Sequence, residues 1–294
     1  MVKSKRAVSY KDKIGVIDWI IFVFLLLAVI TIIFPFWNAL VISLSSEKTF
    51  LQNPLLLFPK ELNFDAYLYM IETKAFWDGY LITLLLVVFG TVYSLFFTLV
   101  AGFALSRKFV GKNFIMNLII VTMFFGGGLI PYFELIRNLG LINTFWVMVV
   151  PGMIGTFNML LIRNYFQSLP EELAESARID GANDLVLFAR IFLPLAMPMV
   201  ATIGLFYAVG NWNQWYTALL FITSRNDLKP LQLVLREMIV TKTSTFPAPS
   251  FDRPVYSEGT KMAAIFFTIT PIMCLYPFLQ KYFVKGIMIG AIKG

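Results

Sequence analysis

The chain has 294 residues, of which 59% are apolar and only 14% are charged, whereas soluble domains carry about 25% charged residues. This composition, together with uncharged stretches long enough to cross a bilayer, excludes a soluble globular enzyme. The absence of histidine excludes histidine-based acid–base catalysis and histidine metal sites, and the single cysteine, Cys274, excludes an internal disulfide and a cysteine-rich metal site.

Uncharged stretches predict six transmembrane helices, because about 20 helical residues cross a hydrocarbon core of roughly 30 Å. In chain order they are residues 19–46, 79–106, 113–133, 138–163 without the terminal Arg163, 191–224 and 262–280. The first stretch is too long for a cleavable signal peptide, and no small-residue cleavage site follows it. The expected fold class is therefore all-α, a polytopic membrane protein with six transmembrane helices, in which residues 1–294 form a single transmembrane domain.

The distribution of charge predicts the orientation of these helices. Six spans place both termini on one side, where the connecting segments carry 14 basic and 7 acidic residues, a net charge of +7. The segments on the other side carry 10 of each. Because positively charged loops stay in the cytoplasm, we expect both termini to be cytoplasmic. The longest external loop would cover about residues 225–261, and within it residues 228–240 predict a short amphipathic helix.

No nucleotide-binding motif of the form G-x-x-x-x-G-K-[ST] occurs in the chain, so we expect no cofactor on it, and any ATP that drives transport must bind to another chain. The three glycines Gly126–Gly128 lie before Pro131 and predict a kink or a close helix approach. The basic N-terminal arm can contact membrane lipid, although setting the topology is its simpler role. No nucleic acid is expected as a partner.

The segment between the fourth and fifth stretches, about residues 164–190, is the most informative part of the chain; we refer to it as the docking loop. Ser168 and Glu171 have the spacing of a capping box, and Pro170 suits the first turn of a helix. A small apolar face on this helix would consist of Leu173, Ala174 and Ala177.

Two signals predict where that helix ends and the next one begins. Asp180 and Gly181 break the helix, since glycine takes the left-handed conformation without steric cost. Asn183 can then cap a second helix that continues into the fifth stretch. The docking loop is therefore expected to be a two-helix elbow.

The docking loop also carries a family pattern. Glu175-Ser176-Ala177, then Gly181, then residues 191–194 after nine positions, resemble the EAA motif E-A-A-x3-G-x9-I-x-L-P of ABC-importer permeases. Only Ser176 departs from it, as one small residue in place of another. Residues 126–152, 211–222 and 281–294 look like segments of carbohydrate-importer permeases of the maltose-permease class, in particular its branch for complex oligosaccharides. The resemblance covers essentially the whole chain.

This resemblance implies the fold of a type I ABC importer permease in the bacterial cytoplasmic membrane. The chain would form half of a translocation pore with a second homologous permease subunit. Two cytoplasmic ATPase subunits would bind ATP, and an extracytoplasmic solute-binding protein would deliver an oligosaccharide, so the chain itself is not expected to be an enzyme. The implied ATPase-docking residues are Glu175, Ser176, Ala177, Asp180 and Gly181. The alternative is an ordinary amphipathic loop helix with a glycine C-cap.

Polar and aromatic side chains are densest in the fifth stretch. The candidate substrate-pathway residues are Asn211, Trp212, Asn213, Gln214, Trp215 and Tyr216. Amides suit the hydroxyl groups of a sugar and aromatic rings suit its C–H faces, and polar groups inside a bundle usually line a cavity. The alternative, left open, is hydrogen bonding between helices together with an interfacial aromatic belt.

Other functions leave signs that are missing here. A phosphate importer of the same class should carry arginine or lysine in its pore, and the fifth stretch has neither between residues 191 and 224. A secondary transporter driven by protons usually has acidic residues in mid-span, and the centres of all six stretches lack them. An integral membrane enzyme would need a catalytic constellation, which we do not find.

Overall fold

The computed structural model describes residues 15–53, 55–240 and 257–291, with side chains as far as residue 275. Within these ranges every regular element is a helix, which confirms the all-α class. The chain divides into two compact units, Met1–Leu68 with Arg253–Ala263, and Tyr69–Asp252 with Ala264–Gly294. The basic arm at the N-terminus lies outside the described residues.

The first unit is dominated by α1 (Val16–Ser43), whose apolar side chains are exposed along most of its length. This helix is long and apolar enough to cross a membrane, as its stretch of sequence predicts. Two short helices follow, α2 (Glu47–Gln52) and the start of α3 (Asp65–Glu72). The end of α1 is held by a hydrogen bond of 2.8 Å between the Ser43 and Tyr67 hydroxyl groups.

In the second unit, three segments join into one long helix over Lys74–Ser106: α4 (Lys74–Leu85), the π-helical turn η1 (Leu86–Gly90) and α5 (Thr91–Ser106). This helix also has the length and composition of a membrane span, so a helix over residues 79–106 is confirmed.

The stretch 113–133 is bent rather than straight. It forms α6 (Lys112–Phe124) and the beginning of α7 (Leu129–Asn138), which meet at an angle of 114°. Gly128 at the bend has φ +87°, a backbone conformation that glycine adopts without strain. The predicted kink is confirmed. The alternative, a close helix approach, is not seen among the described residues, where no heavy atom lies within 4 Å of a Cβ built on Gly126 or Gly127.

A continuous helix over 138–163 is a wrong prediction. After α7 the chain runs through a single 3-10 turn, η2 (Phe145–Met148), before α8 (Thr156–Ser168) begins. The reason is a turn in which Asn143 has φ +58°. The side-chain oxygen of Asn143 accepts hydrogen bonds from the backbone N–H groups of Thr223 and Ser224, at 2.7 and 3.0 Å, and so ties the turn to a distant segment.

The fifth stretch is also broken. The helices α10 (Asp184–Val186), η3 (Leu187–Phe192) and α11 (Leu193–Leu195) meet α12 (Met197–Trp212) at 83°. The elements that follow are α13 (Tyr216–Phe221), η4 (Asn226–Leu228), α14 (Leu231–Val240) and α15 (Ser257–Ala291). The short amphipathic helix expected over 228–240 is thus confirmed as α14. In the described residues two helices are both long and apolar enough to cross a membrane, or up to four elements if each bent pair counts as one span. The number six stays a prediction.

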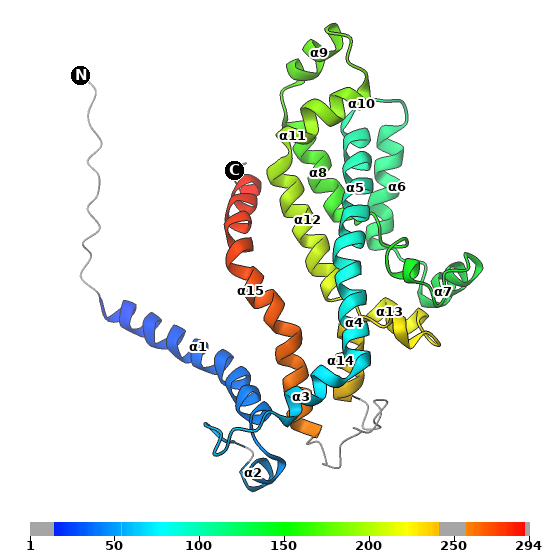
Figure 1. Ribbon diagram of the computed structural model, residues 1–294. Helices are drawn as coiled ribbons and strands as arrows, with labels where there is room; N and C mark the ends of the chain where they lie inside the picture. The colour runs from blue at the N-terminus through cyan, green and yellow to red at the C-terminus, as the bar shows by residue number, and fades with distance from the viewer. Residues whose placement is uncertain (1–14, 54, 241–256, 292–294) are drawn as a thin grey trace. The chain divides into compact units, whose positions relative to one another are not determined.

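The helices α5, α8 and α12 lie side by side and form the centre of the second unit (Figure 1). Gly102 on α5 faces Ile162 on α8 so closely that a Cβ on the glycine would lie 2.5 Å from Ile162 Cγ2. The Tyr207 hydroxyl group on α12 is hydrogen-bonded to the Thr98 hydroxyl group at 2.6 Å and accepts the Gly155 N–H at 2.9 Å. Small residues and shared hydroxyl groups are what membrane helices use to pack closely.

Away from the docking loop, at the end of this bundle where α13 and α14 lie, a second hydrophobic core is found. The buried residues Leu86, Ile136, Phe221 and Leu233 belong to one cluster, which packs α13 and α14 against η1 and α7. Figure 1 shows α7, α13 and α14 at this end and α9 (Glu171–Ile179) at the opposite one. The docking loop and the segment after the fifth stretch are therefore at opposite ends of the second unit.

Candidate functional site

The end of α9 has the geometry that its sequence predicts. Gly181 has φ +85°. Its N–H donates to the Arg178 carbonyl at 3.0 Å, and the N–H of Ala182 donates to the Ala177 carbonyl at 2.9 Å. These two bonds are the Schellman motif, which satisfies the last carbonyl groups of a helix and stops it.

The start of α9 differs from the prediction. Ser168 does not cap α9, because it is the last residue of α8, and its hydroxyl group donates to the Tyr165 carbonyl at 2.7 Å. The N-cap residue is Pro170, with no side-chain capping bond. Glu171 and Glu172 in the first turn supply the negative charge that a helix N-terminus favours.

The predicted cap of the second helix is confirmed: the Asn183 side-chain oxygen accepts the Val186 N–H at 2.9 Å. We expect Asn183→Ala to lower the free energy of unfolding by about 1 kcal/mol, because one N–H at the helix start loses its acceptor. Asn183→Asp keeps an acceptor oxygen and should leave stability nearly unchanged. Thermal unfolding of the purified importer measures both, and equal midpoints for the two variants would contradict the capping role.

The two alanines of α9 point into the protein. Ala174 and Ala177 are buried among the aromatic residues beneath the docking loop. Leu173, expected on the same apolar face, is instead 39% exposed, because its position places it beside that face rather than on it. Of the five docking candidates, Ala177 is therefore the one whose side chain is buried inside the protein.

The outward surface of the docking loop consists of different residues. Glu175, Ser176, Asp180 and Gly181 are all exposed. Two large apolar side chains flank them, Ile179 at 87% and Leu185 at 77% exposure. The sequence reasoning missed both, although an apolar residue on each side of a helix break was the available signal. Exposed apolar side chains around a small residue are typical of a surface that receives a partner.

Beneath the docking loop lies a cluster of phenylalanine rings. Phe103 of α5 contacts Phe166, Phe188 and Phe192, with ring centroids 5.1 to 5.9 Å apart. The Arg107 guanidinium group stacks on this cluster, 4.2 Å from the centre of the Phe192 ring. Burial, and after it the neighbouring Arg178, lower the pKa of Arg107. Aromatic and cation–π contacts thus join the docking loop to the end of α5.

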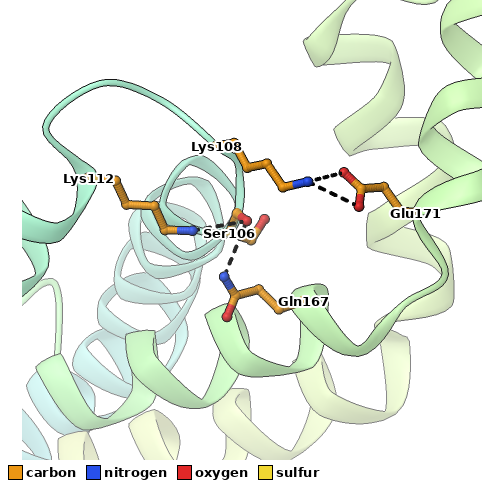
Figure 2. A network of polar contacts seen from close by, with 5 residues as sticks. All are labelled: Ser106, Lys108, Lys112, Gln167 and Glu171. Atoms are coloured by element: carbon orange, nitrogen blue, oxygen red, sulfur yellow. Dashed lines mark hydrogen bonds and ion pairs between the residues drawn. The ribbon is translucent and has the colours of Figure 1, made fainter.

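A polar network ties the same elements together at the surface (Figure 2). Lys108 donates to both carboxylate oxygens of Glu171, at 2.9 and 3.3 Å. Lys112 and Gln167 both donate to the Ser106 carbonyl, each at 3.4 Å. These residues line a cavity of about 380 Å³.

The Lys108–Glu171 pair positions the helix more than it stabilises the protein. The hydrogen bond and the charge of Lys108 hold the pKa of Glu171 below its ordinary value. A lowered carboxyl pKa in the folded state favours folding above the unfolded pKa, and this gain is lost as the pH falls through the folded pKa. The pair therefore persists from neutral pH into the range where free carboxylates begin to protonate. Since both side chains are exposed, its energetic contribution is small.

The six candidate substrate-pathway residues of the fifth stretch fall into two groups. Three of them make contacts inside the bundle, and three lie nearer the surface. Asn211 donates to the Thr91 hydroxyl group at 3.2 Å, and Gln214 donates to the Met148 carbonyl at 3.0 Å. The Trp212 ring is buried and meets the Tyr80 ring edge-on at 6.0 Å, and its indole N–H has no hydrogen-bond partner among the described residues.

The other three members lie nearer the surface. Asn213 is exposed and donates to the Val209 carbonyl of its own helix at 2.9 Å, and Tyr216 is 52% exposed. Trp215 is half-buried and lies under the Arg236 guanidinium group, 4.7 Å from the ring centre. Arg236 is a third residue that the sequence did not reveal, since nothing local in α14 indicates its contact with Trp215.

Comparison with known proteins places these features in a family. Residues 94–289 match the family described as the binding-protein-dependent transport system inner membrane component. The chain belongs to this family. As a member it is a membrane-embedded component of a transporter rather than an enzyme. The helix α9 lies within the residues that match the family.

Individual members of this transport family are similar over nearly their full length. The chain is 40% identical to Protein LplC of Bacillus subtilis (strain 168) over 89% of its own length and 90% of that protein. It is 34% identical to the polygalacturonan/rhamnogalacturonan transport system permease protein YtcP of the same organism, over 94% and 98%. A chain of a bacterial ABC transporter involved in the import of the acidic polysaccharide alginate has a TM-score of 0.85 and 32% identity, over 95% of this chain and 100% of that one.

Proposed function

We propose that the chain is one of two permease subunits in an ABC importer for oligosaccharides. The observation that carries this proposal is full-length similarity to a transport permease named for polygalacturonan and rhamnogalacturonan and to the structure of an alginate importer. In this arrangement six spans form half of the pore, and a solute-binding protein delivers the sugar from outside. Two ATPase subunits bind and hydrolyse ATP, and the chain itself supplies no cofactor.

The docking loop is proposed as the contact with one ATPase subunit. Its support is an outward surface made of Glu175, Ser176, Asp180 and Gly181 between exposed Ile179 and Leu185. Ala177 contributes from beneath, by allowing α9 to lie close to the phenylalanine cluster. The contact of Lys108 with Glu171 would then pass a movement of α9 to the end of α5. Arg107 joins the same end of α5 to η3 through the Phe192 ring.

The proposed orientation places both termini and the docking loop in the cytoplasm. Its support is that Lys108, from one loop predicted to be cytoplasmic, is paired with Glu171 from the other (Figure 2). The helix α14, from the loop predicted to be external, lies at the opposite end of the same unit.

Isolation of the tagged chain in mild detergent, followed by mass spectrometry, tests this proposal. We expect a second six-span permease and two ATPase copies for each tagged chain. ATP-driven uptake of a labelled oligosaccharide into proteoliposomes containing this complex and its binding protein would support the assigned cargo. Uptake of a peptide or polyamine instead would keep the importer and change the cargo. A stable assembly of this chain alone, without ATPase, would overturn the proposal in favour of a secondary transporter.

A further inference from the structure

A cavity of about 320 Å³ lies beside Trp215 of the fifth stretch, at the end of the bundle opposite the docking loop. It is formed between the start of α13 and one face of α14. Its lining residues are Trp215, Gln232, Leu235, Arg236, Ile239 and Val240.

One face of α14 packs against α4, and a different face of the same helix lines the cavity. The Leu231 N–H donates to the Thr83 hydroxyl group of α4 at 2.9 Å. Val234 packs so tightly there that its Cγ2 would lie 3.1 Å from a Cβ on Gly79. The residues that line the cavity follow positions 232, 235, 236 and 239, the spacing of a single helical face. The helix is thus held in place by one face, and the described residues leave the other face uncovered.

Arg236 differs from the other cations nearby because it has no carboxylate partner among the described residues. Lys229 is paired with Glu237 at 2.8 Å, with both side chains largely buried, and Arg225 is paired with Asp227 at 2.6 Å. Arg236 contacts the face of Trp215 instead. A guanidinium group carries five N–H donors in a planar fork, so stacking on a ring leaves its edge free for an acceptor.

We propose that this cavity binds the carboxylate of an acidic sugar, a uronate residue of the transported oligosaccharide; the inference rests on the proposed function. The Arg236 fork matches a carboxylate with two parallel hydrogen bonds. Trp215 with Leu235 and Ile239 offers apolar surface to the C–H faces of the ring, and the Gln232 amide suits its hydroxyl groups.

The chemistry of the cavity selects a uronate over other cargo. A neutral sugar offers only uncharged hydroxyl and ring oxygens, so it lacks both the negative charge and the pair of oxygens that match the guanidinium fork. A phosphorylated sugar carries close to two negative charges, and Arg236 is the single cation among the described lining residues. A single cation next to an aromatic ring and one amide therefore fits one planar monoanion on a sugar.

Uptake into proteoliposomes by the complete importer with its binding protein tests the assignment. The probes are trigalacturonate and trimannuronate, each beside its methyl ester, which keeps the ring and the linkage but lacks the charge. We expect the wild type to take up at least one acid faster than its ester. Arg236→Gln should lower uptake of that acid by at least about tenfold and change uptake of the ester little. Arg236→Lys should be intermediate, because it keeps the charge without the fork.

The matched control is Arg225→Gln, which removes an outer arginine that already has a carboxylate partner and should not alter the ratio of acid to ester uptake. Uptake of the ester also reports whether each variant folds. Equal uptake of acid and ester by the wild type, or an equal loss of both in Arg236→Gln, would overturn the uronate site. Uptake of a neutral trisaccharide but of neither acid would overturn it while leaving the oligosaccharide importer intact. If no carbohydrate is taken up, the proposed function fails as well.

Discussion

Gly181→Asp should abolish ATP-driven uptake while the importer remains assembled in the membrane. No heavy atom of the described residues lies within 4 Å of a Cβ at this position, so that part of the chain has room for the side chain. The cost within the fold is the strain of a non-glycine residue at φ +85°, about 1 kcal/mol. At the proposed docking surface the same change places volume and an unpaired charge between two proteins. Such a charge costs roughly 2–5 kcal/mol, which weakens docking by more than about tenfold.

The matched control for this variant is Gly140→Asp. Gly140 is also exposed, has φ +68° and would have no heavy atom within 4 Å of an added Cβ, but it lies after α7, at the other end of the bundle. Uptake and ATPase activity of the reconstituted importer, together with its thermal midpoint, should show equal stabilities and loss of uptake only for Gly181→Asp. If both variants lose uptake equally, strain rather than docking is responsible.

Glu175→Lys, which reverses an exposed charge on the same surface, should also uncouple transport from ATP hydrolysis.

Gly102→Leu is expected to prevent the second unit from folding. A Cβ at this position would lie 2.5 Å from Ile162 Cγ2 and 3.3 Å from the Arg163 backbone nitrogen, so the clash involves backbone as well as side chain. Either α5 and α8 separate or the side chains leave their rotamers, at a cost of about 3 kcal/mol or more. Size-exclusion chromatography of the fluorescently tagged chain in detergent measures the folded fraction, which should be low.

A double-mutant cycle separates this clash from a general effect of losing a glycine. Gly102→Ala should reduce the thermal midpoint, and Ile162→Ala added to it should restore part of the loss by removing the atoms that clash. Gly210→Ala in α12 is the control, because nothing lies within 4 Å of its Cβ and alanine favours a helix. Independent, additive effects of the substitutions at 102 and 162 would contradict direct packing between α5 and α8.

The features that were predicted correctly depend on a few neighbouring residues. The helix break at Gly181 and the cap at Asn183 follow from hydrogen bonds that span three to five residues, so the local sequence contains all the atoms involved. The Ser168 cap failed because two helices compete for that residue, and its hydroxyl group serves α8. Nothing near Ser168 in the chain reveals which helix continues through it.

The apolar stretches and the motif of the docking loop are properties of the sequence by itself, and they determined the membrane location, the all-α class and the transport family. Only the tertiary structure decided which distant groups the polar side chains meet. Asn211 and Gln214 donate hydrogen bonds to Thr91 and Met148, more than 60 residues away in the chain. Arg236 is brought onto Trp215 and has no carboxylate partner among the described residues. The physical reason is that apolarity is summed over a stretch of neighbouring residues, whereas a hydrogen bond or an ion pair depends on which distant groups the packing of helices brings within about 3 Å.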